Sequence, residues 1–195
     1  MGKIKSALEI ALERTESVQS DKDQIGQFEA KQKGKKLAND FLEGNIKSLE
    51  AELKKFPKNE QENLKQGLFD ILIARICLPS EKDDLKQIET AGLGLSEIIG
   101  GKTFANIAKQ LIQVMNQFIE ETAQYEEAIK QQYEPKLRQK EEEIARRLGR
   151  QIKLDPFQDP EFVAFYNQHM NALKGNYQTI VDQVREEAIK HFEGK

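Results

Sequence analysis

The sequence predicts an all-α fold: an elongated helical bundle with a long coiled-coil-like helix, a kinked charged helical extension and an N-terminal amphipathic arm. Three observations predict it. Leu, Ile, Val and Phe recur at spacings of three and four residues along most of the 195 residues. Charged residues make up 32% of the chain with their signs interspersed, as long solvated helix faces require. No stretch shows the β-branched alternation of a half-buried strand.

The first predicted element is a short amphipathic helix at residues 4–18. A polar stretch, residues 19–24, follows it and interrupts the apolar pattern. We therefore expect residues 1–20 to form an arm that docks on a protein partner, and residues 21–195 to form a single helical bundle domain. The arm would bind through the apolar residues Ile4, Leu8, Leu12 and Val18.

A second helix is predicted over residues 24–56, where Pro57 ends it. In its latter half, residues spaced alternately by four and three form a seam for another helix, namely Leu42, Ile46, Leu49, Leu53 and Phe56. Asn59, with Glu62 three residues later, predicts a capped start for a third helix over residues 60–78, which is apolar nearly all round. We expect this helix to be the most buried element.

Pro79 would end the third helix, and Ser80 with Asp83 would cap a short helix that reaches Ala91. Four of the twelve glycines lie in residues 92–101, which predicts an irregular, turning backbone there.

The longest predicted helix starts at a Thr103 cap and continues to about Tyr133. Its seam repeats the four-three spacing through Phe104, Ala108, Leu111, Met115, Phe118, Thr122, Tyr125 and Ile129. Further apolar residues widen this stripe only in the first half of the helix. We therefore expect the first half to be wedged among several helices and the second half to project like a coiled coil.

Pro135 is predicted to kink or restart the helix, because it has no amide donor. A charged helix then reaches Leu148, with Gly149 as its cap, so that a charged extension spans residues 130–155. Asp159 and Pro160 predict the start of a last helix that ends near residue 192. The central bundle would combine parts of the helices at 24–56, 60–78, 103–133 and 160–192.

No pattern of reactive residues predicts an enzyme. Residues 100–103, GGKT, lack the spacing and the preceding strand of a phosphate-binding loop, so a glycine hinge is the better interpretation. Neither His169 nor His191 has a Glu three residues before it, as a helical metal site would need. We predict no catalytic residue, no metal and no cofactor. A polar concave pocket with converging titratable groups would favour an enzyme instead.

The single cysteine, Cys77, lies in an apolar run, which predicts a packed, inert thiol in a reducing, cytoplasmic protein. No apolar run approaches the roughly 20 residues that a membrane span needs. A formal net charge of -3 provides no overall field for nucleic acid. Together these observations favour a non-catalytic structural or adaptor protein that binds other proteins and self-associates.

The alternative is a nucleic-acid-associated protein that uses a basic surface over residues 136–153. That surface comprises Lys136, Arg138, Arg146, Arg147, Arg150 and Lys153. Three glutamates at residues 141–143 interrupt it, and no aromatic residues are interleaved with it, so nucleic-acid binding is the second choice.

The opening sequence MGKIKSALEIALERTES, followed after a polar gap by GKKLANDFLEG, resembles the start of a bacterial family of uncharacterised, predicted all-helical proteins of about this length. The resemblance is strongest over residues 1–17 and weakens downstream. It implies a bacterial cytoplasmic protein and supplies no activity, substrate or site residue.

Overall fold

In the residues that it describes, the computed structural model has six α-helices and one short 3-10 turn, as the helical spacing of the apolar residues predicts. The structure describes residues 7–100 and 102–194, with side chains from residue 24 onward. The helices are α1 (Ala7–Leu42), α2 (Leu49–Leu53), α3 (Lys58–Ala74), α4 (Lys82–Ile99), α5 (Lys102–Leu148) and α6 (Pro160–Glu193), and the turn is η1 (Pro156–Gln158). No strand occurs within these ranges, which confirms the all-α prediction.

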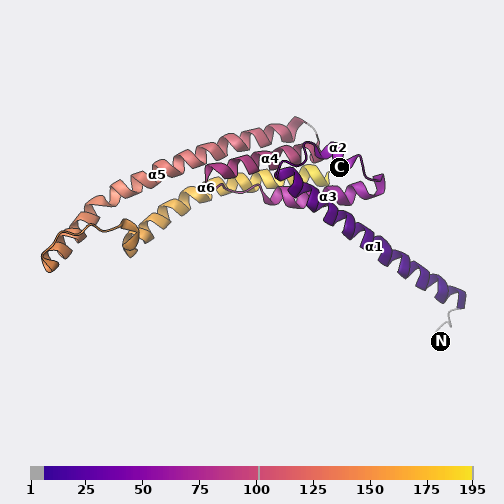
Figure 1. The fold of residues 1–195 in the computed structure, drawn as a ribbon, viewed down its shortest axis with the longest axis horizontal. Coiled ribbons are helices and arrows are strands. Elements are labelled where there is room, and N and C mark those ends of the chain that lie inside the picture. Colours follow the sequence, from indigo (N-terminus) through magenta and orange to yellow (C-terminus); the bar gives the residue numbers. More distant parts are fainter. Residues whose placement is uncertain (1–6, 101, 195) are drawn as a thin grey trace.

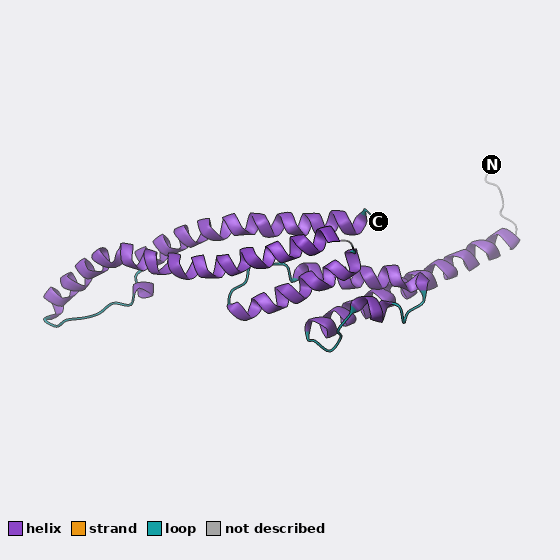
Figure 2. Ribbon diagram, turned by 90° about the horizontal axis from the view of Figure 1, so that it is seen from above, coloured by secondary structure: helices purple, strands orange, loops and turns teal. Residues whose placement is uncertain are grey.

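The molecule is elongated (Figure 1). One end is a hairpin in which α5 and α6 run antiparallel, and α1 extends toward the other end (Figures 1 and 2). Between the two ends, α3 and α4 join them in a bundle that holds the main core.

The predicted break at residues 19–24 is wrong, because α1 continues through it. This stretch is polar but contains neither Pro nor Gly, so its amides can stay in the helical ladder. The predicted continuous helix over 24–56 is also wrong. Gly44, with φ at 81°, donates its N–H to the carbonyl of Phe41, and Asn45 donates to that of Asp40, the usual glycine-based helix end. A separate short α2 follows, capped by Ser48.

The C-terminal half of α1 packs closely on α3 because small residues line the contact. Ala30 and Ala38 are buried there. Gly34 faces the backbone of Leu64 on α3, and Gly67 of α3 faces the backbone of Lys31 on α1. With no Cβ at these two glycines, the two helix backbones lie in direct contact.

Both ends of α3 differ from the prediction. The helix begins at Lys58, before the expected cap Asn59, and no side chain caps it. It ends at Ala74 instead of residue 78. A helix continuing through Pro79 would bring the proline ring against the carbonyl of Arg75, and Arg75 is where the helix stops. Beyond the helix, Ile76 stays buried in the main core, but Cys77 is exposed, so the predicted packed thiol is wrong.

The irregular stretch predicted for residues 92–101 is helical as far as Ile99. The cap of α4 lies one residue later than expected, at Glu81 with Asp84. Gly94 fits here because a Cβ would approach the side chains of Phe41, Leu72 and Leu49, so this glycine serves close packing. Since α4 contributes several buried residues to the main core, it belongs to the central bundle from which we had omitted it.

α5 begins at Lys102, so Thr103 lies inside the helix and is not its cap. It runs as one helix through Pro135, and the predicted restart there is wrong. Proline removes the hydrogen bond to the carbonyl four residues earlier, on Gln131. Gln131 and Pro135 are both exposed, so water can solvate that carbonyl. The helix curves along its length (Figure 1).

The ends of the hairpin agree with the sequence. Gly149 has φ at 65° and ends α5 as predicted. The side chain of Asp159 accepts a hydrogen bond from the N–H of Glu161, and Pro160 begins α6. Along α5, the predicted seam is buried at Phe104, Ala108, Leu111, Met115, Phe118 and Ile129.

The seam is interrupted in the middle, where Thr122 is only partly buried and Tyr125 is 38% exposed. The core is therefore divided into two clusters. The main cluster joins α1, α2, α3 and α4 to the first part of α5 and the last part of α6. A smaller distal cluster in the hairpin consists of Ile129, Tyr133, Phe162 and Met170.

Candidate functional site

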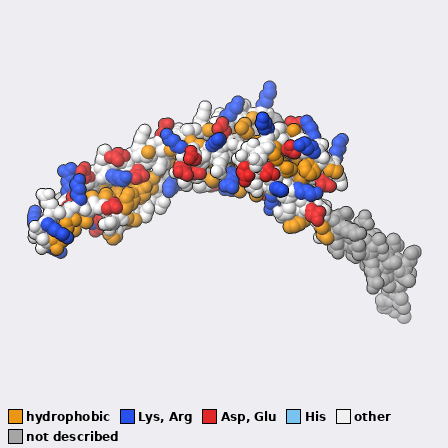
Figure 3. Space-filling view, in the orientation of Figure 1, with side chains coloured by type: hydrophobic (Ala, Val, Ile, Leu, Met, Phe, Trp, Pro, Cys, Tyr) orange, Lys and Arg blue, Asp and Glu red, His pale blue; other side chains and the backbone are white. Residues whose placement is uncertain are grey.

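Three regions are candidates for function: the exposed side of α1, a groove at the tip of the hairpin, and a polar cluster behind the tip, where α6 begins. Figure 3 shows acidic and basic side chains interspersed over one face of the described part of the molecule, without a large field of one sign. Function must therefore be sought in local features.

The exposed side of α1 carries two large apolar residues. Ile25 is 58% exposed and Phe28 is 62% exposed, whereas Ala30, on the side that meets α3, is 1% exposed. At about 100° per residue, Ile25 and Phe28 lie within about 60° of each other and roughly opposite Ala30. The two residues therefore form an apolar surface that none of the described helices covers.

The residues predicted to bind a partner lie further toward the N-terminus of the same helix. Ile4 falls outside the described residues. Leu8, Leu12 and Val18 lie on α1, in the part of the helix whose side chains are not described. Their role stays a prediction.

The groove at the tip, of about 680 Å³, lies where Gly149 reverses the chain and residues 150–154 run back along α5. The N–H of Leu154 donates to Oε1 of Glu141 at 2.7 Å and fixes the returning segment. The lining residues are Arg138, Glu141, Glu142, Ala145, Arg146, Gln151, Ile152 and Lys153.

The predicted basic surface divides into two parts. Three of its residues pair with acids: Lys136 with Glu161 at 2.8 Å, Arg138 with Glu134 at 2.6 Å, and Arg146 with Glu142 at 3.6 Å. The other three, within the described part of the chain, have no acidic partner, and they are Arg147, Arg150 and Lys153.

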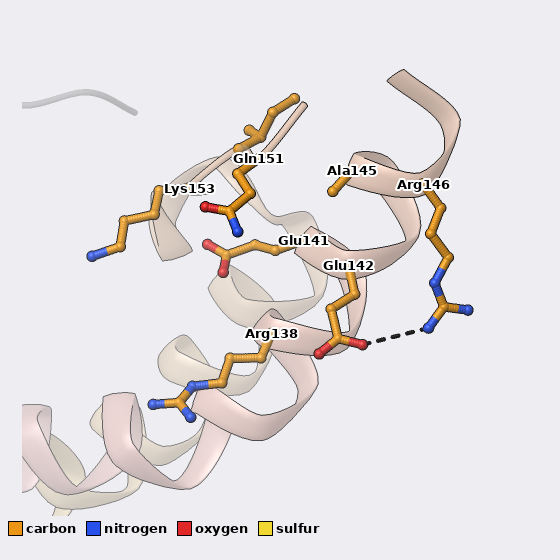
Figure 4. Close-up of a pocket in the computed structure, with 8 residues that line it drawn as sticks. Arg138, Glu141, Glu142, Ala145, Arg146, Gln151 and Lys153 are labelled. Carbon is orange, nitrogen blue, oxygen red and sulfur yellow. Dashed lines mark ion pairs between the residues drawn. The ribbon is translucent and has the colours of Figure 1, made fainter. Parts of the chain in front are cut away.

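The basic side chains do not converge. Figure 4 shows Arg138 and Lys153 extending to one side and Arg146 to the other, with their charged ends apart, while Glu141 points toward Gln151 of the returning segment. A site for a single phosphate would need several donors directed at one point. The tip therefore presents separate charges over a broad surface and does not form a pocket for one anion.

The polar cluster behind the tip joins α5 to the start of α6. Lys140 of α5 lies 2.9 and 2.7 Å from the two carboxylate oxygens of Asp159, which is 8% exposed. Tyr133 donates its hydroxyl to Asp159 at 3.0 Å. Glu161 accepts from Lys140 at 2.9 Å and pairs with Lys136 at 2.8 Å.

The pKa values of this cluster follow from those contacts. Lys140, together with Tyr133 and the amide of Glu161, holds the pKa of Asp159 below its ordinary value. Lys136 and Lys140 lower the pKa of Glu161 to about 2. Hydrogen bonds to Asp159 and Glu161 raise the pKa of Lys140. Asp159, Glu161 and Lys140 are therefore each stabilised in the charged state, whereas burial raises the pKa of Tyr133 and keeps it neutral. None of the four is prepared to exchange a proton near neutral pH.

Sequence reasoning found part of this cluster and missed the rest. The Asp-Pro pair identified Asp159 as the cap of α6. Lys140 precedes it by 19 residues on another helix, and no local pattern relates the two. Only the antiparallel return of the chain at Gly149 brings Lys140 and Tyr133 to the cap.

Within the described ranges, no three His, Cys, Asp or Glu residues are grouped so that they could hold a metal ion. In the same part of the chain, none of the helices has the length and the apolar character needed to cross a membrane.

Comparison with known protein families matches residues 50–190 to the "Family of unknown function (DUF6657)". The matched region contains α3, α4, α5 and all but the last three residues of α6, together with the tip and the polar cluster. It does not include the opening sequence on which the resemblance rested. No curated protein and no solved structure matches the chain. Since the match covers more than half of its residues, the chain belongs to the DUF6657 family of unknown function.

Proposed function

We propose that this protein is a non-catalytic structural or adaptor protein that binds a protein partner, with a second copy of itself as the first candidate, through the exposed side of α1. The observation that carries the proposal is the apolar pair Ile25 and Phe28 on the side of α1 opposite its contact with α3. A bacterial, cytoplasmic setting belongs to the same proposal.

The energetics favour a partner for this surface. Burying Ile25 and Phe28, each more than half exposed, would contribute on the order of 3 kcal/mol. Val18 lies seven residues before Ile25, and residues seven apart stay on the same side of a helix to within about 20°. The continuity of α1 through residues 19–24 thus allows one apolar stripe to extend from Phe28 toward the N-terminus.

The polar groups support a non-catalytic role. Asp159 is the most buried carboxylate in the described part of the chain, and a lysine, a tyrosine hydroxyl and an amide occupy its oxygens. The basic side chains that line the tip groove do not converge on one point. In both places the described polar groups pair with one another, so their contacts stabilise the hairpin.

The test compares the wild-type protein with the double variant Ile25→Ser, Phe28→Ser by sedimentation velocity over a range of concentrations. We expect the wild type to self-associate and the double variant to stay monomeric, with the same helical melt. Leu93→Ser is the matched control, because Leu93 is an equally exposed apolar residue on α4, at 56%. It should leave self-association unchanged.

Two results would overturn the proposal. One is a control variant that weakens association as much as the double variant does. The other is a wild-type protein that stays monomeric at the highest concentration and that, when immobilised, binds the same proteins as the immobilised double variant.

A further inference from the structure

The tip of the hairpin has an unusual composition. Residues 144–154, IARRLGRQIKL, contain four basic residues and no acidic one. They form the last turn of α5, the Gly149 reversal and the start of the returning segment, and they lie at the extreme end of the molecule (Figure 1). Since α5 has 47 residues, it holds this end on the order of 70 Å from its own first turn.

An exposed apolar side chain lies among the basic ones. Leu148, the last residue of α5, is 58% exposed and stands between Arg147 and Arg150 in the sequence. It belongs to neither core cluster. An apolar residue with basic neighbours is suited to the interface of a lipid bilayer, where the apolar side chain enters the boundary between headgroups and acyl chains while the cations meet the headgroup phosphates.

The charges suit an extended surface. Arg147, Arg150 and Lys153 have no acidic partner within the described residues, and the charged ends of the basic side chains drawn in Figure 4 do not meet at one point. The glutamates at 141–143 precede Arg147 on α5 and so lie nearer the body than Arg147 and the Gly149 reversal, and Glu142 is engaged with Arg146. Lys153 lies back along α5, next to Leu154, whose N–H donates to Glu141. A plane of anionic headgroups can meet divergent cations together, whereas a single bound phosphate cannot.

Nucleic acid fits the same surface less well. Sequence-independent binding to single strands combines cations with aromatic side chains on which bases stack, and residues 144–154 contain no aromatic residue. Leu148 would gain nothing from a phosphate backbone. The observations therefore favour a lipid surface.

We propose that the tip of the α5–α6 hairpin docks peripherally on an anionic lipid surface, with Leu148 entering the headgroup layer and Arg147, Arg150 and Lys153 contacting lipid phosphates. The remainder of the chain would stand away from the membrane. The whole chain carries a formal charge of -3 and the tip carries +4, so the rest carries -7 and is repelled by the same surface. The molecule would therefore meet the membrane with the tip of the hairpin, and α1, at the other end, would stay accessible to a protein partner.

The experiment is flotation of the full-length protein with vesicles of phosphatidylcholine alone or mixed with phosphatidylglycerol. We expect binding only to the mixed vesicles, and weaker binding as salt rises. The double variant Arg147→Gln, Arg150→Gln should weaken partitioning about 25-fold, since each basic residue near an anionic surface contributes about fivefold. Leu148→Ser should weaken it severalfold without altering the salt dependence.

The matched control is Lys109→Gln, Lys174→Gln, which changes the charge equally at two exposed positions of the body. It should bind as well as the wild type, and all variants should keep the helical content of the wild type.

Absence of binding to mixed vesicles at low salt would overturn the proposal, as would an equal loss of binding in the control variant. A gel shift of duplex DNA or single-stranded RNA that is lost in the arginine variant, without vesicle binding, would assign the tip to nucleic acid instead. Because α1 lies at the other end, failure here is distinguishable from failure of the adaptor proposal.

Discussion

Gly34 and Gly67 set the distance between α1 and α3. A Cβ on Gly34 would collide with the carbonyl oxygen of Leu64, and a Cβ on Gly67 with that of Lys31. Both obstacles are backbone atoms, so relief requires a shift of a whole helix. The two helices can therefore lie this close only because neither position carries a Cβ.

We expect Gly34→Ala and Gly67→Ala each to lower the free energy of unfolding by roughly 1–3 kcal/mol through overpacking. Gly26 lies on α1, as Gly34 does, but has open space around it. Gly26→Ala should therefore raise the free energy of unfolding by up to about 1 kcal/mol, because alanine favours the helix. Urea denaturation followed by helical circular dichroism measures all three. Equal stability of the Gly34→Ala and Gly26→Ala proteins would show that the helices adjust freely.

Residues of this kind were the hardest to interpret from sequence. Glycine appears identical in a sequence whether it turns the chain, as Gly44 does, or admits a neighbouring helix, as Gly94 does. The sequence predicts an irregular backbone at the glycines after residue 91. Gly100, with φ at 69°, does end α4, whereas Gly94 lies inside the helix, and only the tertiary packing of α4 explains it. Cys77 was misplaced for a related reason, because its helix ends before it.

Among the helices, apolar seams were predicted well and helix ends poorly. The four-three spacing in α5 identified most of its buried residues, since that spacing depends only on helix geometry. Where a helix ends depends, in contrast, on contacts between distant segments or on how water solvates a polar stretch. The polar residues 19–24 did not end α1, and an exposed Pro135 did not end α5.

The pairing of α5 with α6 at Asp159 makes the hairpin sensitive to acid. A carboxylate whose pKa is lowered in the folded protein stabilises the fold above its ordinary pKa, and this contribution disappears as the pH falls through the lowered value. For Glu161 the window runs from the ordinary 4.5 down to about 2. Asp159 acts in the same direction, since its pKa is also lowered.

We therefore expect the thermal midpoint of the wild type to fall as the pH is lowered from 4.5 toward 2. The fall should be smaller in the double variant Asp159→Asn, Glu161→Gln, because its amides do not titrate. Asp155→Asn is the control, since Asp155 caps η1 through the N–H of Phe157 and lies outside the cluster. It should follow the wild-type curve. If the thermal midpoint of the double variant falls as steeply as that of the wild type, the cluster does not cause the loss of stability in acid.

At the scale of the whole molecule, the core is not continuous. The distal cluster contains four buried residues and is separated from the main cluster at Thr122 and Tyr125. The sequence could not reveal this division, because the heptad spacing continues through both positions. The separation becomes visible only when α6 is placed beside α5 and few buried side chains meet there.

A small separate cluster should open more easily than the main one, because local stability follows the apolar area buried locally. Phe162→Ala should therefore weaken the distal cluster by about 3–5 kcal/mol. In hydrogen exchange read by mass spectrometry, protection should fall in residues 126–145 of α5 and 160–170 of α6 and remain in α1, α3 and α4. Phe104→Ala, in the main cluster, should reduce protection throughout the bundle. A uniform loss of protection in Phe162→Ala would mean that the hairpin and the bundle unfold as one unit, and the tip would then be held as rigidly as the core.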